Sequence, residues 1–297
     1  MIDLGSPDLP VLDNRDDVLA IARLAEQSEQ YDDMIKILKP YIENKQSEDL
    51  DFEERNILSV AYKNAVGMRR IAWRAVKKSS NMYRKYNTYI NDYRAKLEEE
   101  CVGICKDMLN LIQKHLLPKA KKFGVDAESE VYYQKLQADY YRYVAEVGTS
   151  KDRIEKAKTR ALKCYNQAIQ LADKLSPADP VRLSLYLNFS VYCFEIYGSQ
   201  EQKEQAVEIA KQGIETAEED LENLDSQKAS ESEFILKFMR ENLTNWRDKI
   251  KKVNASKRNL FSQQDSEAQF INQIDDDDND EDEDEYADND SGSSSEG

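Results

Sequence analysis

The sequence is poor in the residues that interrupt regular structure. Its 297 residues include only 9 glycines and 6 prolines. Turn-rich all-β folds, collagen-like chains and low-complexity chains need many more, so these classes are disfavoured. Long apolar runs are also missing, since no stretch approaches the roughly 20 apolar residues of a membrane span. Residues 1–17 do not have the pattern of a signal peptide. We expect a soluble cytoplasmic protein with access to the nucleus and no membrane insertion.

Histidine and cysteine are scarce as well. The single histidine excludes the usual Ser-His-Asp triads and most zinc-enzyme sites. Four cysteines in a chain of this length do not predict a disulfide framework. Cys101 and Cys105 lie one helical turn apart and His115 follows, but buried thiols explain this pattern better than a metal site does. We therefore predict no metal, no cofactor and no catalytic residue.

Negative charge dominates, but it is concentrated at one end. The formal net charge is −16, and residues 254–297 hold 15 acidic against 2 basic residues, which leaves −3 for residues 1–253. An acidic chain repels phosphate backbones, so no nucleic-acid partner is expected. The pattern predicts three parts: a flexible extension over residues 1–15, a helical domain over residues 16–253, and a disordered acidic tail over residues 254–297.

Apolar residues recur at helical spacing over long stretches, and no period-two run competes with them. Capping signals support several helix starts, including the Asp51–Glu54 and Ser199–Gln202 boxes and the Asp179-Pro180 pair. Short connections favour antiparallel neighbours in one layered, all-α domain. We expect two helices within residues 16–45, and one each over 51–78, 82–117 (ended by Pro118), 126–148, 151–175, 179–197, 200–222 and 228–252.

Two of these helices carry stripes of charge. Lys63, Arg70 and Arg74 share one face of the first helix, and Lys135, Asp139, Arg142 and Tyr143 share one face of the second. One interpretation is a solvated surface with ion pairs inside each helix. The other is that the stripes converge on a dianion, because arginines and a tyrosine hydroxyl hold phosphomonoesters by charge-assisted hydrogen bonds.

Two further stripes are amphipathic. They comprise Leu187, Asn188, Val191 and Glu195, and Ile235, Phe238, Asn242, Asn245 and Trp246. Core packing explains the apolar members. The amides are less suited to a core because a buried amide needs several partners, whereas amides that line a groove can hold an extended peptide.

Several segments resemble one family. Residues 55–70 (RNILSVAYKNAVGMRR), followed by Trp73-Arg74, closely resemble the hallmark segment of the 14-3-3 proteins. Further blocks match in the same order: Tyr31–Met34, Asp139–Tyr143, Leu187–Val191 and Glu241–Trp246. The resemblance extends roughly from Leu19 to Trp246.

The resemblance implies nine antiparallel helices with a concave groove for phosphoserine or phosphothreonine motifs. The protein would then be a non-catalytic adaptor that regulates phosphorylated client proteins by masking, clamping or bridging them. Carried over by position, the phosphate pocket would be Lys63, Arg70, Arg142 and Tyr143. Backbone and groove contacts would come from Lys135, Asp139, Leu187, Asn188, Val191, Glu195, Ile235, Phe238, Asn242 and Trp246. Phe238 and Asn245 replace leucines that are usual in the family, which makes the apolar wall bulkier and more polar.

The resemblance also implies a homodimer, or a heterodimer with related chains, formed by the N-terminal helices. The implied contact residues are Leu24, Ser28, Asp33, Ala72, Val76, Tyr93 and Lys96. Gln30 stands where the family commonly has an arginine facing Glu100, and losing one exposed ion pair costs only about 0–1 kcal/mol. Ala72 replaces a serine that is phosphorylated in some relatives.

Alternatives remain open for the role of the tail and for the function. The segment from Arg258 to Ser262 places a basic residue four positions before a serine, which resembles a phosphopeptide motif. Phosphorylated Ser262, or the acidic run without modification, would then compete for the groove. The simpler interpretation is a tail that only keeps the protein soluble. The rival to the adaptor is a phosphate-independent scaffold or chaperone that holds basic clients with its acidic tail. An enzyme is the third class, and the residue pattern argues against it.

Overall fold

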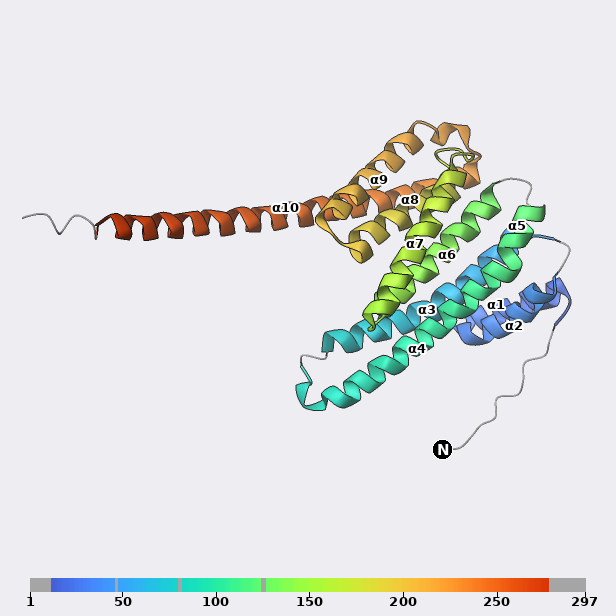
Figure 1. Ribbon diagram of the computed structural model, residues 1–297. Coiled ribbons are helices and arrows are strands. Elements are labelled where there is room, and N and C mark those ends of the chain that lie inside the picture. Colours follow the sequence, from blue (N-terminus) through green and yellow to red (C-terminus); the bar gives the residue numbers. More distant parts are fainter. Residues whose placement is uncertain (1–11, 46–47, 80–81, 124–126, 278–297) are drawn as a thin grey trace, which may run out of the picture. The chain divides into compact units, whose positions relative to one another are not determined.

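The computed structural model describes residues 12–45, 48–79, 82–123 and 127–277, and all of the regular structure in this part of the chain is helical (Figure 1). The α-helices are α1 Arg15–Gln27, α2 Tyr31–Asn44, α3 Phe52–Ser79, α4 Asn87–Leu111, α5 Leu117–Phe123, α6 Glu128–Val147, α7 Lys151–Ala172, α8 Pro180–Val191, α9 Gln200–Glu218 and α10 Ser226–Asp277. Two π-helical segments extend them: η2, Ile112–Leu116, joins α4 to α5 without a break, and η3, Tyr192–Tyr197, continues α8. Short 3₁₀ turns occur at Arg84–Tyr86 and Leu221–Asn223.

The ten α-helical labels therefore correspond to nine continuous helices in the described residues, as the sequence predicts. Consecutive helices pack against each other in the pairs α1–α2, α2–α3, α3–α4, α6–α7 and α8–α9. The chain divides into two compact units, Met1–Thr244 and Asn245–Gly297, with the boundary inside α10. In the described part of the chain, none of the helices has both the length and the apolar character that a membrane span requires.

Local capping residues explain where several helices begin and end. Glu54 and Asp51 exchange backbone-to-side-chain hydrogen bonds of 2.9 Å each, which confirms the predicted capping box at the start of α3. Asp179 accepts from the backbone of Val181 ahead of α8, and the predicted Ser199–Gln202 box caps α9. Gly198 ends η3 in the left-handed region at φ 79°, a conformation that glycine adopts without steric cost.

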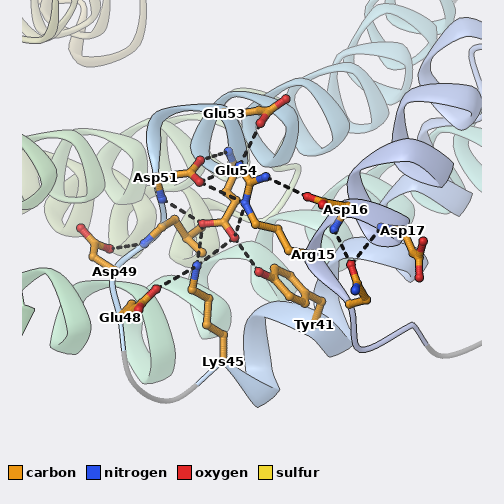
Figure 2. Close-up of polar contacts among 12 residues, drawn as sticks. Arg15, Asp16, Asp17, Tyr41, Lys45, Glu48, Asp49, Asp51, Glu53 and Glu54 are labelled. Atoms are coloured by element: carbon orange, nitrogen blue, oxygen red, sulfur yellow. Dashed lines mark hydrogen bonds and ion pairs between the residues drawn. The ribbon is translucent and has the colours of Figure 1, made fainter.

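A buried carboxylate links the first three helices (Figure 2). Glu54 on α3 accepts hydrogen bonds from the Tyr41 hydroxyl at 2.6 Å and from Lys45 Nζ at 2.8 Å, both contributed by the end of α2. Arg15, at the start of α1, contacts Asp51 at 2.6 Å and Glu53 at 2.8 Å. These contacts fix the start of α3 relative to α1 and α2.

The apolar faces of the helices meet in two clusters. The larger is formed mainly by α1–α4 and α6, with fully buried Tyr62, Met108 and Tyr140 among its members. The smaller joins α8, α9 and the first turns of α10 through Leu183, Ile214 and Leu236. Cys101 and Cys105 are buried thiols, and burial raises the pKa of Cys105 well above its ordinary value.

Two helix ends differ from the prediction. Pro118 does not end its helix, because α5 continues to Phe123. Proline normally clashes with the carbonyl four residues before it; here that residue, Lys114, lies in the π-helical segment, where the backbone ladder is wider.

The last helix also continues beyond Lys252, where the apolar periodicity ends, as far as Asp277. Residues 226–277 contain no glycine or proline and are rich in good helix formers, so propensity favours the longer helix. The division into extension, domain and disordered tail stays a prediction. Residues 1–11 and 278–297 lie outside the described residues.

Candidate functional site

Two neighbouring helices, α3 and α6, carry the cationic residues that the sequence predicts to bind phosphate. The guanidinium carbon of Arg70 on α3 lies 4.0 Å from the centroid of the Tyr143 ring on α6, and that of Arg142 lies 4.6 Å from the same ring. The structure thus brings together three of the four residues predicted to bind phosphate. The fourth, Lys63, lies two turns before Arg70 on α3, with an exposed side chain and no ion pair in the described part of the chain.

Each arginine is held by a carboxylate. Arg70 donates from Nε and Nη2 to Glu146 at 2.9 and 2.5 Å, and Arg74 donates to the other oxygen of Glu146 at 2.9 Å. Arg142 donates from Nε to the Tyr165 hydroxyl at 3.1 Å and from Nη2 to Asp139 at 3.2 Å. In both Arg70 and Arg142, Nη1 has no hydrogen-bond partner among the described residues.

Asp139 organises the other side of the site. Its carboxylate is 3% exposed and accepts four hydrogen bonds, from Lys135 Nζ at 3.0 Å, Arg142 Nη2 at 3.2 Å, the Tyr165 hydroxyl at 2.6 Å and Asn188 Nδ2 at 2.8 Å. Burial alone would raise the pKa of Asp139, but the charges of Lys135 and Arg142 outweigh it and keep that pKa below its ordinary value. The carboxylate therefore stays ionised and fixes donors from α6, α7 and α8.

The predicted groove residues on α8 and η3 differ in their environments. Leu187 is half-buried against the smaller apolar cluster, and Val191 is half-buried at the end of α8. Asn188 uses its amide nitrogen on Asp139, which leaves the carbonyl oxygen without a partner in the described residues. Glu195 is exposed on η3 and forms no ion pair in the described chain.

On α10, Ile235 is half-buried against the same cluster, whereas Phe238 is 41% exposed and packs edge-to-face on Phe234 with ring centroids 4.9 Å apart. Asn242 is half-buried. Trp246 is buried and belongs to the second unit, Asn245–Gly297. Ser262 lies in the helical backbone of α10, and its side chain is outside the described residues.

The residues predicted at a dimer contact lie on α1–α4. Leu24 and Tyr93 are 58% and 51% exposed, and Ala72 and Val76 are half-buried beside the core. Ser28 donates to the carbonyl of Leu24. Within one chain Asp33 pairs with Lys36 at 2.7 Å and Lys96 with Glu100 at 3.8 Å, so the expected Asp33–Lys96 pair between protomers stays a prediction.

Sequence reasoning missed two residues of the site, Glu146 and Tyr165. Glu146 had a visible signal, because it lies one turn after Arg142 and continues the charged stripe of α6. Tyr165 had none, because its role depends on how α7 packs against α6.

The solvated-surface interpretation is partly right, since Lys135 and Arg142 do form ion pairs inside α6, but those pairs are buried.

These features define an all-helical protein in which two arginines from neighbouring helices lie against one tyrosine ring and are oriented by buried or half-buried carboxylates. A family model described as 14-3-3 protein matches residues 21–247. The chain is 40% identical to 14-3-3-like protein 2 of Caenorhabditis elegans, over 79% of this chain and 92% of that protein. It is 40% identical to 14-3-3 protein zeta of Bombyx mori, over 78% and 92% of the two chains. It is 39% identical to checkpoint signal transducer rad24 of Schizosaccharomyces pombe, over 78% and 85%. The chain belongs to the 14-3-3 family.

Proposed function

We propose that this protein binds phosphoserine or phosphothreonine motifs of client proteins, holding the phosphate with Lys63, Arg70, Arg142 and Tyr143. It regulates those clients by masking, clamping or bridging them, and it catalyses no reaction. Family membership supports a role in binding and regulating client proteins. The phosphate chemistry and the residues are argued from the geometry of the site.

The observation that carries the proposal is the state of the two arginines. Arg70 and Arg142 lie against one tyrosine ring, and each uses Nε and Nη2 on an internal partner. Their Nη1 groups remain available as donors. A phosphate has a charge of about −1.5 to −2 at pH 7 and three acceptor oxygens, so it satisfies donors that a neutral serine hydroxyl cannot. Because the arginines are already oriented, little side-chain entropy is lost on binding.

The neighbouring residues suit the rest of an extended peptide. The free carbonyl oxygen of Asn188 can accept a backbone N–H, and Lys135 and Asn242 can contact backbone carbonyls. Leu187, Val191, Ile235 and Phe238 offer apolar contacts, and Glu195 assists, whereas a role for Trp246 stays a prediction. A partly exposed phenylalanine at position 238 favours bulky apolar residues in the client.

We further propose a dimer through the α1–α4 contact residues, as a homodimer or with a related chain. The exposed Leu24 and Tyr93 provide the apolar surface for it. Two grooves on one dimer would give a doubly phosphorylated client an avidity gain of about 10²–10⁴. A cytoplasmic location stays a prediction.

Titration of one serine peptide, with and without phosphate, tests the function. The full chain should bind the phosphopeptide, and Arg70→Ala plus Arg142→Ala should weaken binding more than about 100-fold, because each charge-assisted hydrogen bond contributes about 1.5–3 kcal/mol. Lys63→Gln changes an exposed side chain and should weaken binding without affecting folding. Arg160→Ala plus Arg240→Ala, two exposed arginines elsewhere, is the matched control.

Equal binding of both peptides to every variant would refute the proposal. It would favour the alternative, a phosphate-independent scaffold or chaperone, which would also require binding to be lost with the acidic tail. Phosphorylated Ser262 as a self-ligand requires α10 to unwind locally, because a groove-bound peptide is extended whereas residue 262 is helical.

A further inference from the structure

A cleft of about 750 Å³ adjoins the phosphate site on the side of Arg74. We call it the lysine cleft. It is lined from α3, α6, α7 and η3, with the buried Trp73 among the lining side chains. Its charged lining residues are Arg74, Lys77, Lys78, Lys158, Glu146 and Glu195.

The lysine cleft retains positive charge after its internal ion pairs are considered. Both oxygens of Glu146 are occupied, one by Arg70 and one by Arg74. Lys158 pairs at 3.3 Å with Glu155, whose side chain is 60% exposed, and such a pair is weak and screened by solvent. Lys78 is exposed and forms no ion pair in the described chain. Glu195, on η3, is the opposing charge in the lining.

The distance between Arg70 and Lys78 along α3 determines which peptide residue can reach Lys78. Lys78 lies eight positions after Arg70 on α3, which corresponds to about 12 Å along the helix axis. An extended peptide advances about 3.3 Å per residue. A peptide that runs along α3 with its phosphate at Arg70 therefore places a side chain about four residues away beside Lys78.

We infer that the lysine cleft is a second anion subsite, which selects clients with an acidic or phosphorylated residue three to four positions from the bound phosphoresidue. The inference rests on the proposed function and narrows its ligand class from a single phosphoresidue to a doubly anionic segment. Lys78 and Lys158 are the residues that confer this preference. Lys77, also in the lining, has its Nζ 4.9 Å from the centroid of the Trp73 ring.

The test uses the full chain and one phosphoserine peptide in five versions. Two carry an aspartate pair three and four residues before or after the phosphoserine, two carry asparagines at the same positions, and one carries a second phosphoserine four residues away on the preferred side. Calorimetric titration at low and at physiological salt gives the affinities. We expect about 3- to 10-fold tighter binding of the aspartate version on one side, more for the second phosphate, and smaller gains at higher salt.

Lys78→Gln plus Lys158→Gln should abolish that gain and leave the affinity for the asparagine versions unchanged. Lys114→Gln plus Lys156→Gln removes the same charge from exposed positions outside the cleft and should preserve the gain. If the asparagine phosphopeptides bind but aspartate changes affinity less than twofold on both sides, or the gain survives in the cleft variant, the subsite is refuted and the phosphate site stands. If no phosphopeptide binds, the proposed function fails and the subsite with it.

Discussion

Among single residues, Asp139 has the widest influence on the site. It is the shared acceptor for Lys135, Arg142, Tyr165 and Asn188, which come from three helices. A buried carboxylate with four donors is stable because each donor offsets part of its desolvation. Removing its charge leaves Lys135 and Arg142 without their compensating partner inside the protein.

Replacing Asp139 by asparagine should therefore be strongly destabilising. We expect Asp139→Asn to lower the free energy of unfolding by about 3–5 kcal/mol, the usual cost of breaking a buried ion pair. Urea denaturation followed by circular dichroism measures this. Asp173→Asn is the matched control, because Asp173 is 72% exposed and pairs with Arg182 at 3.4 Å, so the change should be below about 1 kcal/mol. Equal effects of the two substitutions would contradict the assigned role of Asp139.

The pKa shift of the Asp139 carboxylate predicts that the free energy of unfolding depends on pH. The pKa of Asp139 is lower in the folded chain than its ordinary value of 3.8, so its ionised form stabilises the fold at pH values above about 4, and this contribution decreases as the pH falls through the folded-state pKa. The difference in unfolding free energy between wild type and Asp139→Asn should be constant from pH 7 to 5 and should narrow below pH 4. A difference that widens at low pH would contradict the direction of the pKa shift.

At this scale the sequence predicts part of the geometry of the candidate site, since Arg70, Arg142 and Tyr143 do lie together. Lys63, Arg70, Arg142 and Tyr143 were recognisable because helical spacing aligns them on two faces and the family blocks contain them. Spacing does not reveal that Arg70 reaches Glu146, 76 positions later in the sequence, or that Arg142 reaches Tyr165. Those contacts depend on helix packing, which one sequence does not specify.

Among the secondary-structure elements, the helix ends show which local sequence signals are sufficient to predict a helix boundary. The Asp51–Glu54 and Ser199–Gln202 boxes were predictable because the residues that form them are close together along the chain. The π-helical segments η2 and η3 were not, because a one-residue shift in the backbone ladder leaves no compositional signal. Because of that shift, the helix continues past Pro118, and the helix end predicted from this proline was wrong.

Replacement by alanine should change the stability in opposite directions at two glycines. Gly198 has φ 79°, so Gly198→Ala should cost about 1–2 kcal/mol for the left-handed conformation. Gly67 lies inside α3 with open space where the methyl group of an alanine would point, so Gly67→Ala should stabilise by about 0.5–1 kcal/mol. Thermal unfolding of both variants measures the two signs, and a destabilised Gly67→Ala would indicate that α3 is more crowded than the structure shows.

At the scale of the whole molecule, the proposed dimer makes a direct prediction. Leu24→Glu plus Tyr93→Glu places charges on two exposed apolar positions of the α1–α4 surface. We expect the full chain to have the mass of a dimer, and this variant the mass of a monomer, in size-exclusion chromatography with light scattering. Phe234→Glu, at a 63% exposed position on α10, should remain a dimer. A wild-type chain that is monomeric at micromolar concentration would refute the dimer.

One continuous helix, α3, carries both Lys63 and Arg70 of the proposed phosphate site and Ala72 and Val76 of the proposed dimer surface. Its first turn is tied to α1 and α2 by Glu54 and Arg15 (Figure 2). In the proposed dimer, the distance between the two proposed phosphate pockets would therefore be fixed by α3 and would not adjust to the ligand. The proposal then implies a minimum linker length: a client whose two phosphoresidues are joined by a shorter linker would engage only one pocket, however strong each motif is.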